Sequence, residues 1–231
     1  MPIAHKGIHD GKVPENSLTA FQKAVEGNFP IELDVHIIKS GEVVVFHDDN
    51  IKRMCGIDKE ISKCTFTELR ELYLKNSHER IPLLSEALAK IDGKVPLLIE
   101  LKYDQPTGRL EAATLEIPKY YKGKYALQSF SPLSLRWLKK HAPNIPRGQL
   151  ASDFKGNKKV SILLKPLLKN IWHFSTTKPD FISYDIHALP SKRIAKLRAA
   201  GTPVLGWTVS DVTESKEALK YCDNLICEKI L

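Results

Sequence analysis

The stretch from Pro30 to Asp48 constrains the fold of this chain more than any other part of the sequence. Two runs rich in Val, Ile and Leu flank the dipeptide Ser40-Gly41, a combination typical of a turn between strands. Only about five residues separate the two runs, too few for the helical crossover that a parallel pair requires. We therefore predict an antiparallel β-hairpin in which an arm over Val43–His47 returns beside a strand over Ile31–Ile38.

The polar residues of that first strand share one face. Period-two alternation directs the aliphatic side chains to one side and Glu32, Asp34 and His36 to the other. Two carboxylates on one face of a buried strand are costly unless a cation meets them. Pairing about Ser40-Gly41 brings His47 beside Asp34, so the hairpin predicts a metal-assisted acid–base site.

Strand-like and helix-like segments alternate over most of the remaining chain. Further strands are predicted in the opening segment that ends at His5-Lys6-Gly7 and at Pro96–Lys102, Tyr125–Ser129, Arg147–Leu150, Phe181–Ile186, Val204–Val209 and Asn224–Cys227. Helices are predicted from Asn16 or Ser17 to Gly27, after a capping box at Thr65 and Glu68, at Ser85–Ile91, after Ser131-Pro132 and at Ser191–Ala200. A mixed polar segment joins the hairpin to the capping box.

The alternation predicts a parallel α/β fold. The strand-like runs number nine, and assigning Val43–His47 to the hairpin arm leaves the eight that a TIM (β/α)8 barrel needs. We predict one barrel domain over residues 1–231, with an extra hairpin arm after the second strand. An open doubly wound sheet is the alternative, but the glycine-rich turn that typically follows its first strand is missing.

Composition narrows the classes of protein further. The 231 residues are 42% hydrophobic and 27% charged, ordinary for a domain with a large core. The four cysteines show neither a CxxC motif nor zinc-type spacing and are expected to be reduced thiols. There is no apolar leader before His5 and no 18-residue apolar stretch, so a cytoplasmic location is expected.

The net charge of +8 favours anionic partners. Phosphate esters, nucleic acid and an acidic membrane face all fit, but the lysines and arginines form no long block, so nucleic acid is the least favoured.

Catalytic residues of such a barrel lie at the carboxyl ends of its strands. That rule gathers His5, Lys6, Glu32, Asp34, His47, Glu100, Lys102, Gln128 and Trp207 at one rim. Three carboxylates suit a hard cation, Mg²⁺ or Ca²⁺, better than zinc.

The motifs HKG, PENS, IELDV, VVVFHD, LLIELK, QSF and WTV, in this order and spacing, resemble those of glycerophosphodiester phosphodiesterases. The resemblance runs from Ala4 to about Cys227. It implies a TIM barrel, a divalent metal, and a small-molecule glycerophosphodiester substrate cleaved to glycerol 3-phosphate and an alcohol.

The resemblance also implies roles for individual residues. Glu32, Asp34 and Glu100 match the metal-binding acids, and His5 and His47 match the catalytic histidines. Lys102 is expected near the phosphate or the acids, and Gln128 and Trp207 are candidates for the substrate pocket.

The sequence departs from the family pattern at two places. Lys6 replaces the usual arginine of H-R-G, which keeps the positive charge but loses the bidentate fork on phosphate oxygens. Near the C-terminus LICEKI replaces I-T-D-x-P, which makes Glu228 a candidate for the aspartate's place.

A phosphodiester gains negative charge in its transition state, which a metal with Lys6 and Lys102 nearby would offset. One histidine would deprotonate the nucleophile and the other would protonate the leaving alcohol. The alternatives are a lysophospholipase D-like or cyclic phosphodiesterase activity in the same site, and a non-catalytic barrel that binds phosphodiesters.

The segment Lys158–Trp172 is amphipathic and basic. We favour a barrel helix or long loop that packs on the core. The alternative is a lid or apolar mouth near the site, which would admit lipid-like diesters or touch an acidic membrane. The other histidines match no motif and are interpreted as structural or surface residues, with most doubt at His36.

Overall fold

The computed structural model describes residues 1–103, 106–116, 121–156 and 160–230. Within these residues the strands are β1 (Ile3–Ala4), β2 (Ile31–Ile37), β3 (Val43–Val45), β4 (Leu97–Leu101), β5 (Tyr125–Ser129), β6 (Arg147–Ala151), β7 (Phe181–Asp185), β8 (Val204–Val209) and β9 (Asn224–Cys227). The helices are α1 (Leu18–Glu26), α2 (Lys52–Cys55), α3 (Phe66–Arg70), α4 (Leu84–Ile91), α5 (Arg109–Glu116), α6 (Pro132–His141), α7 (Lys165–Lys169), α8 (Phe174–Thr177), α9 (Lys192–Ala199) and α10 (Val212–Ala218), with 3₁₀ turns η1 (Ile61–Lys63) and η3 (Ile186–Ala188).

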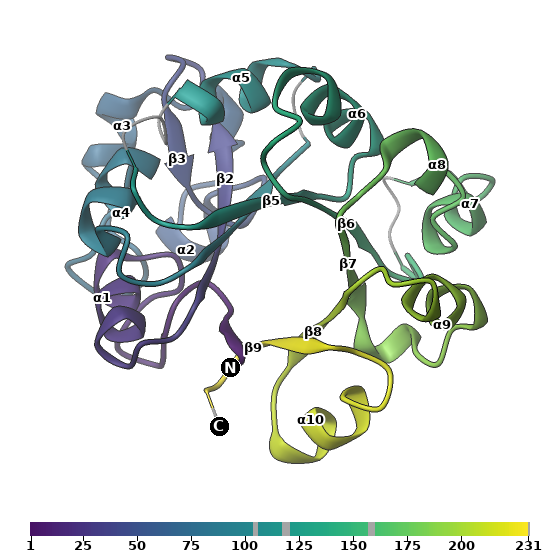
Figure 1. Cartoon of the computed structure of the whole chain (residues 1–231). Helices are drawn as coiled ribbons and strands as arrows, with labels where there is room; N and C mark the ends of the chain where they lie inside the picture. Colours follow the sequence, from purple (N-terminus) through teal and green to yellow (C-terminus); the bar gives the residue numbers. More distant parts are fainter. Residues whose placement is uncertain (104–105, 117–120, 157–159, 231) are drawn as a thin grey trace.

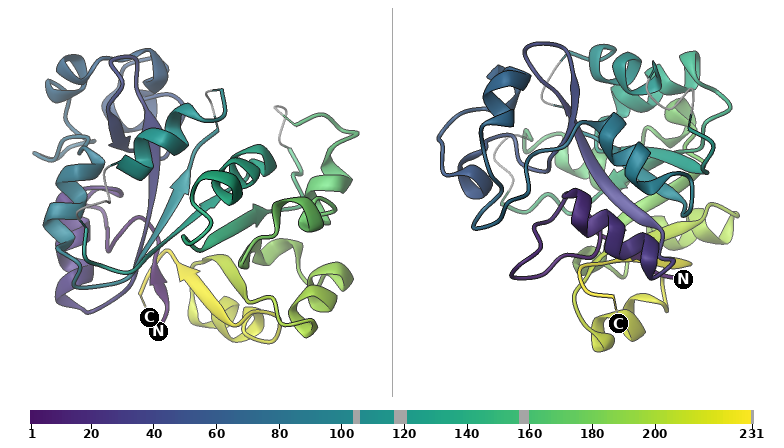
Figure 2. Two further views of the ribbon diagram at one scale, coloured as in Figure 1. Left: turned by 45° about the horizontal axis from the view of Figure 1, so that its top comes forward. Right: turned by 90° about the vertical axis from the view of Figure 1, so that its left-hand side faces the viewer.

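Eight parallel strands close into a ring. The order is β1-β9-β8-β7-β6-β5-β4-β2, and β2 pairs back with β1 at Ile31 and Ala4. Helices surround the ring, and the two termini lie together below it (Figures 1 and 2). The predicted TIM barrel is confirmed, and the doubly wound alternative is wrong because the sheet has closed.

The hairpin prediction is also confirmed. Strand β3 pairs antiparallel with β2 outside the ring, with Val35 opposite Val45 and Ile37 opposite Val43. The arm is shorter than predicted, since the strand ends at Val45. The backbone N–H of Phe46 still donates to the carbonyl of Asp34 at 3.0 Å, which keeps the following His47 beside β2.

Local end signals place the helices well. The Ser17 hydroxyl accepts the N–H of Ala20 at the start of α1, and Thr65 and Glu68 form the predicted capping box of α3. Helices α5 and α10 were not predicted from the sequence; α5 packs against β2 and β3, and α10 packs against β8.

The polar connection after the hairpin is not a simple loop. It contains α2 and η1, and its few apolar side chains form a separate core with residues of the arm. The buried members of this core include Val44, Phe46, Ile51, Met54 and Ile61. Spaced single apolar residues lack a clear period, so the sequence pattern concealed this cluster.

The expectation that the segment 158–172 packs on the core is wrong for most of its apolar side chains. Ile171 is fully buried, but Ile162, Leu163 and Trp172 are largely exposed. Lys158 and Lys159 lie outside the described residues. In the part of the chain that is described, no helix is both long and apolar enough to cross a bilayer.

Candidate active site

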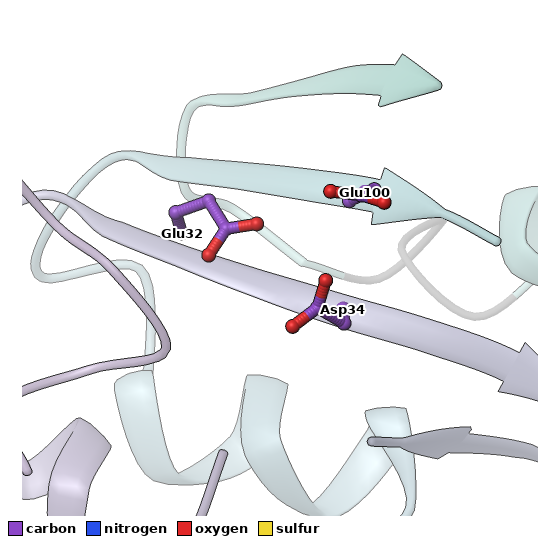
Figure 3. Close-up of side chains that lie close together, drawn as sticks. All are labelled: Glu32, Asp34 and Glu100. Carbon is purple, nitrogen blue, oxygen red and sulfur yellow. The ribbon is translucent and has the colours of Figure 1, made fainter. Parts of the chain in front are cut away.

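Three acidic side chains meet at the centre of the barrel. Glu32 and Asp34 lie on β2 and Glu100 on β4, where the register places Asp34 opposite Glu100. One oxygen from each carboxylate lies within 4.8 Å of the others, and the residues are only 2%, 1% and 7% exposed. Figure 3 shows the three side chains gathered over the two neighbouring strands. Like charges this close and this buried require a cation.

Lys102 supplies part of that positive charge. Its Nζ lies 2.7 Å from Asp34 Oδ1 and 2.6 Å from Glu100 Oε1. Burial raises the pKa of Asp34, but the positive charges around it, that of Lys102 foremost, together outweigh burial and hold this pKa below its usual value. Burial would likewise lower the pKa of Lys102, and the two carboxylates raise it instead. Lys102 therefore bridges two of the acids as a fixed ion pair.

Glu32 has no such partner. Burial, with the negative charges of Asp34 and Glu100, raises its pKa well above the ordinary value. The backbone N–H of Lys6 donates to its Oε2 at 3.1 Å. A carboxylate that is costly to ionise beside two further acids is typical of a site for a hard cation, and three oxygen donors fit Mg²⁺ or Ca²⁺.

Asn16 was not predicted as a site residue, although it lies in the PENS motif. Its Nδ2 donates to Asp34 Oδ2 at 2.8 Å. Its backbone has φ of +55°, in the left-handed region that asparagine tolerates. The amide therefore fixes the Asp34 carboxylate from the side opposite Lys102.

His5 follows β1 and pairs with a carboxylate from the other end of the chain. Its Nδ1 lies 2.5 Å from Glu228 Oε2. The hydrogen bond from His5 lowers the pKa of Glu228, so the carboxylate is ionised and can only accept. The proton of this bond is then on Nδ1, and Nε2, 4.0 Å from Glu32 Oε2, faces the acids.

His9 approaches the same carboxylate from its other oxygen. Its Nε2 lies 3.5 Å from Glu228 Oε1. Burial lowers the pKa of His9, so the ring is neutral near pH 7. Glu228 therefore lies between His9 and the first of the predicted catalytic histidines.

His47 has a matching partner. Its Nδ1 lies 2.7 Å from Asp48 Oδ1, and Arg53 donates to the same carboxylate at 2.6 Å and 3.1 Å. Burial raises the pKa of Asp48, but hydrogen bonds from His47 and Arg53 outweigh it and lower this pKa. Both predicted catalytic histidines thus present Nε2 and hold a carboxylate on Nδ1. The dipeptide His47-Asp48 was the available sequence signal for the second pair.

A cavity of about 110 Å³ joins these groups. Its wall includes His5, Glu32, His47, Glu100, Lys102, Gln128 and Trp207. It shares His47, Glu100, Lys102 and Phe130 with an outer cleft of about 430 Å³. A larger groove, of about 590 Å³, lies beside α9 and is lined by none of these residues.

Gln128 and Trp207 each contact a neighbouring side chain. Ser183 Oγ donates to Gln128 Oε1 at 2.7 Å, which leaves the Gln128 amide N–H groups for other partners. The Trp207 ring meets Phe130 edge to face, with ring centroids 5.6 Å apart. Both residues lie where a substrate contact was predicted.

Lys6 forms an ion pair with Glu15, a carboxylate outside the cluster of three acids. Its Nζ lies 3.1 Å from Glu15 Oε1, and Arg53 donates to both oxygens of Glu15 at 2.8 Å and 2.7 Å. The turn after Lys6 passes close to α1 at Gly7. Only glycine fits there, because a Cβ at Gly7 would lie 2.8 Å from the carbonyl carbon of Ala20. The ammonium of Lys6 is therefore part of an ion network behind His47.

His36 is fully buried, and its Nε2 lies 3.4 Å from the carbonyl oxygen of His47. This contact joins β2 to the end of the return arm, which fits the structural role that was expected of His36.

Fold and site together define a class: a (β/α)8 barrel with a buried cluster of three acids and two carboxylate-paired histidines at the carboxyl ends of its strands. Comparison with known proteins specifies the family. The model of the glycerophosphoryl diester phosphodiesterase family matches residues 5–227. This chain therefore belongs to that family, and it is a phosphodiester hydrolase.

Individual relatives agree. A glycerophosphodiester phosphodiesterase of Caldanaerobacter subterraneus is 30% identical over 94% of this chain and 89% of its own length. A human lysophospholipase D is 36% identical over 43% of this chain and 35% of its own length. A phosphodiesterase of Oleispira antarctica, solved with the product sn-glycerol 3-phosphate, superposes with a TM-score of 0.82 at 24% identity and covers 98% of this chain and 92% of its own.

Proposed function

We propose that this protein hydrolyses glycerophosphodiesters to glycerol 3-phosphate and an alcohol, using His5 and His47 as an acid–base pair. The observation that carries the proposal is the convergence of both Nε2-presenting histidines and two of the acids on one cavity. Family membership and the relatives named above support the substrate class.

The three acids Glu32, Asp34 and Glu100 are proposed to hold a divalent cation, Mg²⁺ or Ca²⁺. Their oxygen donors, spacing and burial fit a hard ion. When bound, such an ion polarises phosphoryl oxygens and offsets charge in the transition state. With the ion bound, Lys102 would no longer be the main charge that neutralises Asp34 and Glu100, and its contacts would hold these two side chains in position. Asn16 would keep the Asp34 carboxylate oriented.

The two histidines are proposed to work in opposite protonation states. Each ring is held by a carboxylate at Nδ1, so only Nε2 exchanges a proton with substrate or water. One ring takes a proton from the nucleophile and the other gives one to the leaving oxygen, and each role contributes about 10²–10⁴-fold in rate. Gln128 and Trp207 are proposed substrate contacts, and Lys6 contributes positive potential from behind His47.

The test is release of glycerol 3-phosphate from glycerophosphocholine. We expect turnover by the native protein with Mg²⁺ or Ca²⁺, loss on chelation, and loss of about 10²-fold or more in His5→Ala and His47→Ala. His141→Ala, an exposed histidine at the end of α6, is the matched control and keeps full activity. Native activity in both site variants would refute the acid–base assignment. Absence of turnover by the native protein with either metal would refute glycerophosphocholine hydrolysis and leave the lysophospholipase D-like activity, the cyclic phosphodiesterase activity and the non-catalytic binding barrel.

A lysophospholipase D-like activity is the second candidate. It is favoured by the partial match to the human enzyme and by the outer cleft, where Tyr103 and Phe130 offer an apolar wall for an acyl chain. Comparing kcat/KM for lysophosphatidylcholine and glycerophosphocholine separates the two, and a cyclic glycerophosphate substrate tests the cyclic phosphodiesterase alternative.

A cytoplasmic location is proposed on separate grounds. All four cysteines are free, and three of them are buried. Free thiols are typical of proteins kept in a reducing compartment.

A further inference from the structure

An exposed apolar patch surrounds α7. The patch consists of Ile162, Leu163, Leu164, Leu167 and Trp172, and Ile162, Leu163 and Trp172 are 79%, 81% and 64% exposed. The N–H of Trp172 donates to the carbonyl of Leu167 at 3.1 Å, so Trp172 lies next to Leu167. Large apolar side chains gathered on a surface in this way mark a binding face. We call these five residues the α7 patch.

The segment that carries the patch is anchored to the barrel. Ile171, beside Trp172, is fully buried in the core formed by β7 and its neighbours. At the end of α8, the Arg147 guanidinium donates to the carbonyl of Lys178 at 2.8 Å, and Lys139 Nζ donates to that of Thr176 at 2.9 Å. The segment is therefore anchored to the barrel at the C-terminal end of the patch.

The charged residues between Asp153 and Asp180, the stretch that carries the patch, are all lysines. Residues 154–179 contain six lysines and neither aspartate nor glutamate, so this stretch contributes +6 to a chain of net charge +8. Lys165 and Lys169 lie within α7 itself, and Lys165 lies between the exposed Leu164 and Leu167. Apolar side chains interleaved with lysines complement the interface of an anionic bilayer, where the lysines meet headgroups and the apolar groups enter the acyl boundary.

The patch lies at the catalytic end of the molecule. The connection that carries it leaves the carboxyl end of β6, and the left view of Figure 2 shows it rising at the end toward which β4 points. Phe154 in the same connection packs edge to face on Phe130, with ring centroids 6.0 Å apart. Phe130 in turn lines both the cavity and the outer cleft. A surface bound by the patch would therefore be held beside the mouth of the site.

We propose that the α7 patch docks the protein on an anionic lipid surface. The apolar residues insert at the headgroup boundary and the lysines of the same segment bind the lipid phosphates. The docking does not depend on the proposed hydrolysis, because it is a property of a surface outside the acid cluster. If the proposed function holds, docking presents the cavity to diesters that partition into membranes.

The test uses the full chain and lipid vesicles without substrate. We expect co-sedimentation with phosphatidylglycerol–phosphatidylcholine vesicles at low salt, and little with phosphatidylcholine alone. The Ile162→Ser/Leu163→Ser variant should lose about tenfold or more of the partition constant, and Lys165→Gln about fivefold. Leu219→Ser is the matched control, because Leu219 is 49% exposed after α10, at the other end of the barrel. It should bind as the native chain does.

Fluorescence gives an independent readout. The chain has three tryptophans, and of these Trp172 is the exposed one. Anionic vesicles should shift its emission to the blue, and the shift should be absent in Trp172→Phe. Hydrolysis of soluble glycerophosphocholine should stay unchanged in the serine variants, which verifies their folding.

Three results would overturn the proposal. They are failure of the native chain to bind anionic vesicles, equal binding by the double variant and the Leu219→Ser control, and a stable dimer in solution that buries Trp172. The last result would assign the patch to a second copy of this chain.

Discussion

The ion network behind His47 yields the sharpest quantitative prediction, through Glu15→Gln. Glu15 accepts hydrogen bonds from Lys6 and from both terminal nitrogens of Arg53, and Arg53 also holds Asp48. Glutamine keeps the size of the side chain but removes the charge that two cations share. The variant therefore isolates the electrostatic contribution of one carboxylate.

The magnitude follows from the pKa of Glu15. Burial raises this pKa, but the hydrogen bonds from Arg53 and the charges of Lys6 and Arg53 outweigh it and lower it from 4.5 to about 2. At about 1.4 kcal/mol per pKa unit the difference corresponds to about 3 kcal/mol of unfolding free energy at pH 7. Glu15 is 11% exposed and Arg53 44%, so solvent screening reduces the expected loss to about 2 kcal/mol.

The sign of the pH dependence is fixed. Because the folded pKa lies below the unfolded one, the stabilisation is complete above about pH 4.5 and is lost as the pH falls through about 2. The free energy of unfolding of the native protein should exceed that of Glu15→Gln by about 2 kcal/mol at pH 7 and by about 1 kcal/mol at pH 3.

Urea unfolding of both proteins at the two pH values measures these differences. Glu217→Gln is the control. Glu217 forms an exposed ion pair with Lys220, so this substitution should leave the free energy of unfolding nearly unchanged. A stability loss in Glu15→Gln that is equal at pH 7 and pH 3 would refute the electrostatic reasoning. A loss no larger than that of the control would do the same.

Three further substitutions probe the site. Glu228→Gln should lower kcat by about 10²-fold, alter the pH profile and leave KM nearly unchanged, because His5 loses its orienting carboxylate; an unchanged kcat in steady-state assays would contradict this. Asn16→Ala should weaken Mg²⁺ or Ca²⁺ binding about tenfold or more by calorimetry, since Asp34 loses its amide partner; native affinity would argue against the orienting role. Lys102→Met should cost about 3–5 kcal/mol in chelator, because two buried carboxylates lose their cation. Added divalent metal should restore much of that stability in thermal melts, and a variant as stable as the native protein in chelator would exclude the buried ion pair.

The elements that could be predicted from sequence are those encoded by near neighbours. The hairpin follows from two apolar runs around Ser40-Gly41, and the start of α1 follows from a hydroxyl at Ser17 that accepts the N–H of Ala20. Both depend on contacts within a few residues of the chain, so periodicity and turn chemistry suffice to find them. The separate core formed by residues 49–64 was not predicted, for the opposite reason. Ile51, Met54 and Ile61 are isolated in sequence and become a core only against Val44 and Phe46.

The candidate site divides in the same way. Glu32 and Asp34 could be recognised from their two-residue spacing on one strand, and their predicted companions Glu100, His5 and His47 lie around the same barrel centre. The carboxylate partners of the two histidines were harder to predict from the sequence. His47 is paired with the next residue, whereas His5 is paired with Glu228, 223 positions away. The Lys6 side chain, expected near the phosphate, is drawn to Glu15 by an ion pair that no local pattern encodes.

The sequence by itself determined the alternation of strands and helices, the hairpin, the acids and the family, because each is written in spacing along the chain. Closure of the barrel decided the rest. It brought β1 and β9 together and thereby joined His5 to Glu228. It anchored α8 to the ring and left the α7 patch facing outward. Whether an apolar side chain is buried or exposed depends on which distant surface reaches it, and only the folded chain specifies that.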